Sequence, residues 1–177
     1  MILNKSIIPL IIALSFTVSS SSFAKALKVG DDAPNFSLKA TNGKTYSLAN
    51  YKGRQAVVLA WYPMANTRGC TIECLSLVKE GHLIREYDVS YFMASVDPLE
   101  DNIDFAKQTK ADFPMLSDPT KIAAKAYDVL NFIGFAKRWT FYISKEGKIL
   151  KIDKNIHPKT AAKNIADNLN LLGFKSR

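Results

Sequence analysis

The sequence predicts an α/β protein that has one mixed central sheet, helices on both faces of that sheet and an N-terminal β-hairpin. Two continuous apolar runs, at residues 56–62 and 89–96, are typical of strands buried on both faces. Segments with helical periodicity follow each run, and this alternation of strands and helices indicates an α/β sheet. The 177 residues, 47% of them hydrophobic and 23% charged, suit a single folded domain.

The first half of the chain is expected to form a hairpin, two buried strands and a helix between them. Asn42-Gly43 is a strong signal for the turn of a hairpin. Pro63 ends the first buried strand, and a polar loop leads into the helix, in which Gly81 is a weak point. Asp97-Pro98 closes the second strand. In chain order, these elements are expected at residues 36–38, 45–48, 56–62, 71–86 and 89–96.

The second half is expected to form a helix, a short strand, a second helix, a hairpin and a final helix. Asp118 is a candidate cap for the second helix, and Glu146-Gly147 marks the turn of the hairpin. Pro158 suits the first turn of the last helix, which should stop at Gly173. These elements are expected at residues 101–110, 113–116, 122–127, 140–143, 148–152 and 158–173. The complete order of strands and helices is that of a thioredoxin-like fold.

Residues 1–24 are interpreted as a secretory signal peptide, and residues 27–177 as the folded domain. Lys5 precedes a short apolar run at residues 7–18, and small residues lead to an expected cut after Ala24, with a second candidate after Ala26. A membrane anchor is the alternative, but the run is shorter than the ~20 residues that a membrane helix needs, and Pro9 interrupts it. We therefore expect an exported protein, periplasmic or secreted, with no stable membrane insertion after cleavage.

The net charge is +8, but the basic residues are scattered and include no run of five or more like charges. A solvated surface explains this pattern better than nucleic-acid binding does, so no nucleic-acid partner is expected. Weak attraction to acidic membrane surfaces or acidic partners remains open. Several aromatic and apolar residues could form an apolar wall near the site, belong to the core or make a dimer contact: Trp61, Tyr62, Phe132, Ile133, Phe135 and Trp139.

The only two cysteines, Cys70 and Cys74, stand four positions apart. Two cysteines are too few for a disulfide framework, so a chemical role is favoured. Cys70 follows a buried strand and begins a helix, where unpaired N–H groups and the helix dipole favour an anion such as a thiolate. The hydroxyl of Thr67, three residues earlier, could bond the sulfur or an incoming oxygen.

Pro63, Thr67 and Cys70 reproduce the P-x-x-x-T-x-x-C signature of peroxiredoxins, which the chain resembles over residues 28–172. The string from Trp61 through Thr71 resembles most the bacterioferritin-comigratory, or Q-type, branch. Three further segments resemble the opening strand, the F-P-x-L-S-D segment and the R-x-T-F strand entry of that family. They are residues 29–36, residues 113–118 and residues 138–141.

The resemblance implies a thiol-dependent peroxidase that reduces hydrogen peroxide or organic hydroperoxides through a sulfenic acid. Cys70 would be the peroxidatic nucleophile, Thr67 would orient the peroxide, and Pro63 would shield the pocket. Arg138 would stabilise the thiolate and polarise the O–O bond. The expected partners are a peroxide and a thioredoxin-like or other thiol reductant. No cofactor and no metal are expected, and the protein should be a monomer or a weak dimer.

The second thiol departs from the pattern of the branch. Many Q-type members have a resolving cysteine five positions after the peroxidatic one, whereas here position 75 is Leu75 and the thiol is Cys74. A disulfide between Cys70 and Cys74 would require the first helical turn to unwind, because residues within a helix seldom satisfy disulfide geometry. Cys74 is the favoured resolving residue. The rival is a one-cysteine cycle with an external thiol, in which Cys74 is a small buried hydrophobe.

Two other classes compete. The Cys-x-x-x-Cys pair on an exported chain also resembles Sco-type copper chaperones, since thiolates select Cu(I). Those proteins add a histidine before a late strand, whereas here the only histidines are His82 and His157. An exported thiol:disulfide oxidoreductase would need Cys-x-x-Cys and a proline before the late strand, where this chain has Trp139-Thr140.

Overall fold

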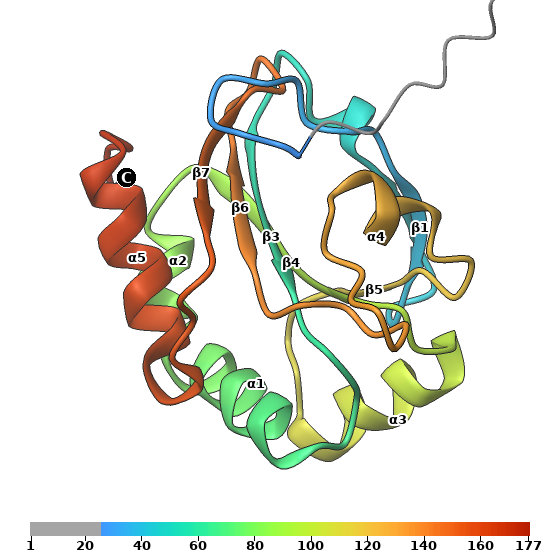
Figure 1. Ribbon diagram of the computed structural model, residues 1–177. Coiled ribbons are helices and arrows are strands. Elements are labelled where there is room, and N and C mark those ends of the chain that lie inside the picture. Colours follow the sequence, from blue (N-terminus) through green and yellow to red (C-terminus); the bar gives the residue numbers. More distant parts are fainter. Residues whose placement is uncertain (1–25) are drawn as a thin grey trace, which may run out of the picture.

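The computed structural model describes residues 26–177, which form a seven-stranded mixed sheet with helices on both faces (Figure 1). The strands are β1 (Ser37–Ala40), β2 (Thr45–Ser47), β3 (Ala56–Trp61), β4 (Val89–Ser95), β5 (Met115–Ser117), β6 (Thr140–Ile143) and β7 (Ile149–Asp153). The helices are α1 (Arg68–Glu80), α2 (His82–Arg85), α3 (Leu99–Thr109), α4 (Ile122–Ala126) and α5 (Ala161–Leu171), with 3₁₀ turns η1 (Leu48–Asn50) and η2 (Pro158–Thr160). The expected signal peptide lies outside the described residues.

The strands are arranged in the order β2-β1-β5-β4-β3-β6-β7. β3, β4 and β5 are parallel neighbours, and the remaining pairs are antiparallel. All six residues of β3 are buried, as its unbroken apolar run predicts. The predicted fold class, including the N-terminal hairpin of β1 and β2, is confirmed.

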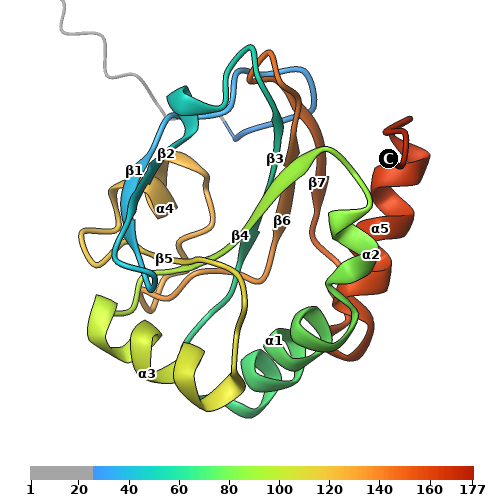
Figure 2. The same cartoon turned by 180° about the vertical axis from the view of Figure 1, so that it is seen from behind.

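The two faces of the sheet are covered by different elements, as Figures 1 and 2 show. One apolar cluster packs between the sheet and α4 and includes Trp61, Tyr127 and Phe141. The other packs between the sheet and the remaining helices and includes Tyr62 and both cysteines. Successive side chains of a strand point to opposite faces, so Trp61 and Tyr62, next to each other in the chain, enter different clusters.

The last α-helix begins at Ala161 rather than at Pro158, because Pro158–Thr160 form the 3₁₀ turn η2, and the helix predicted at residues 71–86 differs more strongly. α1 begins at Arg68, three residues earlier than expected, and Thr67 is its N-cap. It ends at Glu80, and α2 begins at His82, so the predicted helix divides at Gly81. A Cβ at Gly81 would collide with the backbone oxygen of Leu77 and lie 3.0 Å from the hydroxyl of Tyr91. This position therefore requires glycine, whose low helix propensity weakens the helix there.

Asp118 caps α4 from outside the helix. The N-cap position belongs to Lys121, but the backbone N–H of Ala124 donates to Oδ2 of the fully buried Asp118 at 2.8 Å. The carboxylate thus satisfies a helix N–H that would otherwise lack a partner. Among the described residues, no helix is both long enough and apolar enough to cross a bilayer.

Candidate active site

The predicted cysteine loop joins the end of β3 to the start of α1, at the carboxyl ends of the parallel strands. Backbone hydrogen bonds fix both sides of the end of β3: Trp61 N donates to Trp139 O at 2.8 Å, and Tyr62 N donates to Ala94 O at 2.9 Å. Farther along the loop, Ala65 N donates to a carboxylate oxygen of Asp97 at 2.9 Å. The loop is therefore held by the strands on either side of β3 and by the segment that follows β4.

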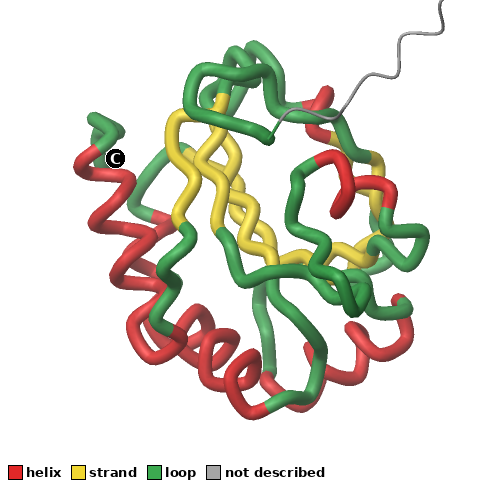
Figure 3. The backbone as a smooth tube through the Cα atoms, viewed as in Figure 1, coloured by secondary structure: helices red, strands yellow, loops and turns green. Residues whose placement is uncertain are grey.

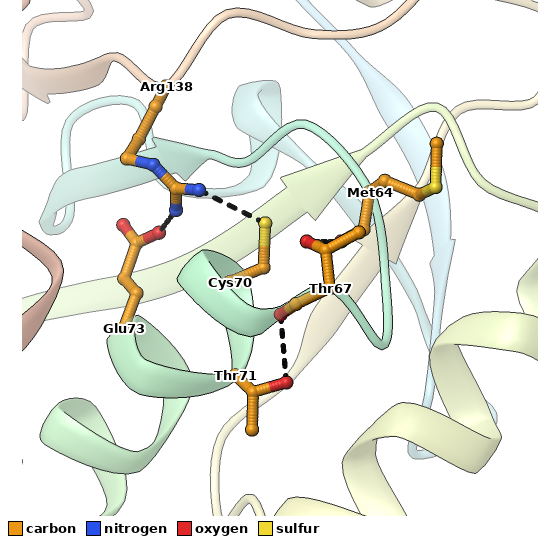
Figure 4. Close-up of polar contacts among 6 residues, drawn as sticks. All are labelled: Met64, Thr67, Cys70, Thr71, Glu73 and Arg138. Carbon is orange, nitrogen blue, oxygen red and sulfur yellow. Dashed lines mark hydrogen bonds and ion pairs between the residues drawn. The ribbon is translucent and has the colours of Figure 1, made fainter.

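Cys70 is the third residue of α1 and has no solvent-exposed surface. Its sulfur faces the segment that precedes β6, where Nη2 of Arg138 donates to Sγ at 3.1 Å (Figure 4). Because β6 runs antiparallel to β3, the residues just before β6 lie beside the end of β3. This topology brings Cys70 and Arg138 together across a long sequence separation.

A second partner of Arg138 was not anticipated from the sequence. Nη1 of Arg138 forms an ion pair with a carboxylate oxygen of Glu73, and the guanidinium lies between this carboxylate and the sulfur of Cys70 in Figure 4. Glu73 is only 1% exposed and lies one helical turn beyond Cys70. The signal was available, because residues three apart on a helix share a face. Glutamate in a helix is usually exposed to solvent, so the sequence alone did not suggest a buried Glu73 paired with Arg138.

The electrostatics of this triad are set by burial. Burial raises the pKa of the Glu73 carboxyl to about 7, against the opposing effects of charge and hydrogen bonding from Arg138. Burial lowers the pKa of Arg138, but Glu73 and Cys70 raise it by more, so the net shift is upward. The guanidinium therefore stays charged at every relevant pH. It can stabilise negative charge on the sulfur or on an oxygen beside the sulfur.

The absence of a side chain at Gly69 leaves space for the guanidinium of Arg138. A Cβ on that residue would stand 3.3 Å from Nη2 of Arg138, closer than most Cβ contacts in proteins. Glycine in the first turn of α1 thus lets the guanidinium reach the sulfur of Cys70. Sequence reasoning did not assign a role to this residue.

Thr67 and Pro63 lie in the loop that leads into α1 and Cys70, and both are partly buried. The Thr67 hydroxyl donates to the backbone oxygen of Met64 at 2.9 Å, whereas the Thr67 carbonyl accepts from Thr71 (Figure 4). With its proton committed to Met64, the Thr67 oxygen keeps lone pairs that can accept a hydrogen bond from a peroxide O–H. The direct bond from Thr67 to the sulfur, one of the two expected possibilities, is not among the contacts of the described residues.

Cys74 is also fully buried, but its thiol points toward α3. Sγ donates to the hydroxyl oxygen of Thr109 at 3.2 Å, and that hydroxyl donates to the backbone oxygen of Phe105 at 2.7 Å. Burial raises the pKa of the Cys74 thiol to about 12, which the Thr109 hydrogen bond only partly offsets. Both cysteines are free thiols, and the helix that carries them is continuous from Arg68 to Glu80.

Buried hydrogen bonds connect the ends of the parallel strands near the site. The Tyr62 hydroxyl donates to the side chain of Asn102 at 2.6 Å, and Asn102 also bonds to Ser95. The hydroxyl of Ser117 donates to the backbone oxygen of Asp97 at 2.6 Å. Trp61 and Tyr62 are both fully buried and belong to the core, with Tyr62 in the same apolar cluster as Cys70.

The other residues of that suggested wall, and the histidines, are not fully buried. Phe132 and Ile133 are exposed, and both His82 and His157 are exposed. Within residues 26–177, no group of three histidine, cysteine, aspartate or glutamate side chains is arranged to hold a metal ion. The fold and the site together define a thioredoxin-like protein with a buried thiol that accepts a hydrogen bond from a charged guanidinium.

Comparisons with known proteins identify the family. Residues 29–152 match the model of the AhpC/TSA family. Peroxiredoxin Bcp of Bacillus subtilis is 32% identical over 133 residues, which cover 71% of this chain and 83% of that protein. Alkyl hydroperoxide reductase E of Mycobacterium tuberculosis is 33% identical over 126 residues, which cover 70% of this chain and 82% of that protein.

The solved structures agree with the sequence relatives. Peroxidoxin BcpB of Mycobacterium tuberculosis superposes with a TM-score of 0.73 at 27% identity, covering 82% of this chain and 97% of that one. The chain belongs to the AhpC/TSA family and matches its bacterioferritin-comigratory, Q-type branch. It is a thiol peroxidase of the peroxiredoxin type, and such enzymes reduce peroxides at the expense of thiol reductants. Neither the copper chaperone nor the thiol:disulfide oxidoreductase is favoured by these matches.

Proposed function

We propose that this protein is an exported peroxidase that reduces hydrogen peroxide and organic hydroperoxides through a sulfenic acid at Cys70. The observation that carries the proposal is the 3.1 Å hydrogen bond from Arg138 to the sulfur of Cys70, in a buried site at a helix N-terminus. The thiolate attacks one peroxide oxygen, the O–O bond breaks, and the departing oxygen takes a proton to leave as an alcohol or water. Negative charge moves from sulfur to that oxygen, and Arg138 stabilises it at both positions.

Each neighbouring residue has a part in this step. Thr67 accepts a hydrogen bond from the peroxide O–H, Pro63 shields the pocket from water, and Glu73 holds the guanidinium in place through its ion pair. The contacts of Thr67 and Arg138 support their roles, because the Thr67 oxygen keeps lone pairs that can accept and one nitrogen of Arg138 is directed at the sulfur.

Cys74 is proposed to resolve the sulfenic acid. Its thiol attacks the sulfur of Cys70, water leaves, and a disulfide forms that an external dithiol of the thioredoxin type then reduces. The thiol must first leave Thr109, and the first turns of α1 must unwind, because the two side chains point in different directions. The burial of Cys74 against Thr109 also supports a rival, in which an external thiol resolves Cys70 directly.

One oxidation experiment tests the cycle. The reduced protein receives one equivalent of peroxide and is then digested without reductant and analysed by mass spectrometry. A peptide that links Cys70 to Cys74 is expected. Sulfenic acid on Cys70 without such a peptide would support the one-cysteine cycle. An unmodified Cys70, with peroxide left unconsumed, would contradict the peroxidase itself.

The site of action is also a proposal. We propose that residues 1–24 are removed during export and that the enzyme works in the periplasm or outside the cell, as a monomer or a weak dimer. The charged start and short apolar run support cleavage. Mass spectrometry of the N-terminus of the protein recovered from the exporting cell would find residue 25 first. An intact N-terminus in the cytoplasm would overturn the proposal.

A further inference from the structure

The segment between α4 and β6, drawn as loop in Figure 3, carries an unusual concentration of exposed apolar side chains. Six large apolar residues are exposed in residues 26–177, and three of them belong to α4 or to this segment. Phe132 is 100% exposed, Ile133 is 62% exposed and Ile122 is 71% exposed. Single exposed apolar side chains are ordinary, whereas a group of them within a short stretch of the chain points to a contact surface.

The loop holds these side chains in a defined conformation. Leu130 and Ala136 form an antiparallel bridge, so residues 130–136 make a small hairpin. Within it, Oδ1 of Asn131 accepts from Ile133 N at 3.1 Å and from Phe135 N at 3.0 Å. The side chain of Asn131 therefore accepts hydrogen bonds from two backbone N–H groups of the tip and fixes its conformation. In this conformation the side chains of Phe132 and Ile133 are exposed to solvent.

One lysine lies directly beside this tip, and others lie on α4 and at the base of the hairpin. A Cβ on Gly134 would lie 2.9 Å from Nζ of Lys121, so the start of α4 stands beside the tip. Lys125 follows one helical turn along α4 and is exposed. At the base of the hairpin, Nζ of Lys137 lies 3.1 Å from the backbone oxygen of Asp128, whose exposed carboxylate is the acidic group of this segment.

A tryptophan extends the surface from the base of the hairpin. Nζ of Lys137 lies 4.6 Å from the ring centroid of Trp139, and Nζ of Lys154, in the segment that follows β7, lies 4.0 Å from the same centroid. Tryptophan and lysine side chains of this kind are typical of the boundary between a bilayer and water. We call this surface, made by Lys121, Ile122, Lys125, Phe132, Ile133, Lys137, Trp139 and Lys154, the lysine-ringed tip.

We propose that the lysine-ringed tip docks on the surface of a bilayer that contains anionic lipids, with Phe132 and Ile133 inserted at the headgroup level. The apolar tip enters the lipid without needing a matching pocket, whereas a folded partner would have to supply one. The lysines bind the anionic headgroups. A second copy of the chain suits this surface less well, because two lysine-ringed tips would repel each other. This inference does not depend on the proposed peroxidase chemistry.

Vesicle sedimentation tests the docking. Residues 26–177 contain the whole sheet and both apolar clusters, so this part is used without the apolar run of residues 7–18, which would itself bind lipid. It is mixed with vesicles of phosphatidylcholine alone and with vesicles that also contain phosphatidylglycerol. Binding is expected only to the second kind and should weaken as salt is added.

Matched variants locate the contact. Phe132→Ser combined with Ile133→Ser should lower vesicle affinity on the order of tenfold. Lys121→Gln combined with Lys125→Gln should lower it by about fivefold for each lysine removed. Leu171→Ser, which changes a residue that is 79% exposed on α5, and Lys159→Gln in η2 should leave affinity unchanged. Circular dichroism confirms that each variant is folded.

A fluorescent reporter gives an independent measurement. In Phe132→Trp, emission should shift to shorter wavelength with anionic vesicles and should be quenched by lipids brominated in the acyl chain. The proposal is overturned if the protein binds no anionic vesicle or if the Leu171 variant loses as much affinity as the tip variant. It is equally overturned if sedimentation velocity reveals a dimer that the Phe132 and Ile133 substitutions dissociate while vesicles have no effect.

Discussion

Nη2 of Arg138 lies 3.1 Å from Sγ of Cys70, although the two residues are 68 positions apart in the sequence. The sheet sets this distance. The loop after β3 leads to the first turn of α1, which contains Cys70, and the antiparallel strand β6 begins beside the end of β3. The same guanidinium is held from its other side by the buried carboxylate of Glu73. The reactivity of the sulfur therefore depends on a charge arrangement that three separate elements maintain.

Arg138→Ala should slow the reaction of the reduced enzyme with hydrogen peroxide by about 10²–10³-fold, since one preorganised donor to the developing charge is lost. Arg138→Lys should recover only part of the rate, because a lysine cannot contact Cys70 and Glu73 through two nitrogens at once. Stopped-flow measurement of oxidation gives the rate constants. Lys137→Ala, one residue away, is the control and should react as the wild type does.

Removing Arg138 also leaves Glu73 buried without its partner, which by itself destabilises the fold. The double variant Arg138→Ala with Glu73→Gln separates the two effects. Its stability should recover toward that of the wild type, while its reaction with peroxide stays slow. A double variant that regains the wild-type rate would show that Arg138 acts only through the fold.

Glu73 should make stability depend on pH between about 5 and 7. Its pKa is raised by burial to about 7 in the folded protein, so in this range the folded state binds a proton that the unfolded state has lost. Stability should therefore fall as pH rises through this window, by on the order of 3 kcal/mol for this group. Urea unfolding at several pH values measures the fall.

Glu73→Gln should remove this contribution, because an amide does not titrate. The difference between the variant and the wild type isolates Glu73 from all other titrating groups. The variant should gain stability relative to the wild type as pH rises from 5 to 7. A constant difference over this range would mean that Arg138 keeps the carboxyl ionised throughout.

Gly69→Ala should move stability and reactivity in opposite directions. Alanine favours the helix by up to about 1 kcal/mol over glycine, so thermal stability should not fall. The new Cβ would stand 3.3 Å from Nη2 of Arg138, and the displaced guanidinium should slow oxidation by about tenfold. Gly81→Ala is the contrast: it should lower stability through its collision with Leu77 and leave the rate unchanged.

Thr109→Val should accelerate the formation of a disulfide between Cys70 and Cys74. The substitution removes the acceptor that holds the Cys74 thiol against α3, a hydrogen bond worth about 1 kcal/mol, so the rate should rise about fivefold. Rapid quenching followed by mass spectrometry measures the disulfide. Thr109→Ser keeps the hydroxyl and should behave as the wild type does. Equal rates in both variants would contradict control by this contact.

The sequence predicted the sheet and the family because both rest on strong local patterns. The apolar runs of β3 and β4 are long and uninterrupted, and the signature with Pro63, Thr67 and Cys70 is specific in residue type and spacing. The hairpin of β1 and β2 followed from one turn dipeptide, and Gly43 has the positive φ, 78°, that the turn needs.

What the sequence did not reveal depends on long-range packing. The start of α1 at Arg68 was missed, although Thr67 before it is a residue type that commonly caps helices. In the structure the Thr67 hydroxyl does not cap a helix N–H but donates to the backbone oxygen of Met64. Glu73 is charged but only 1% exposed, because Arg138, in the segment that precedes β6, pairs with it inside the protein. The direction of Cys74 was equally unreadable, since it is fixed by Thr109 on a different helix.

The separate orientations of the two thiols have a consequence for the tolerance of the enzyme to its own substrate. If Cys74 resolves the sulfenic acid as proposed, the oxidised sulfur of Cys70 must wait until α1 opens before Cys74 can reach it. During that wait a second peroxide molecule competes for the same sulfur and carries it on to sulfinic acid, a form that thiols do not reverse. The opening rate of one helical turn would then set the highest peroxide concentration at which the enzyme survives.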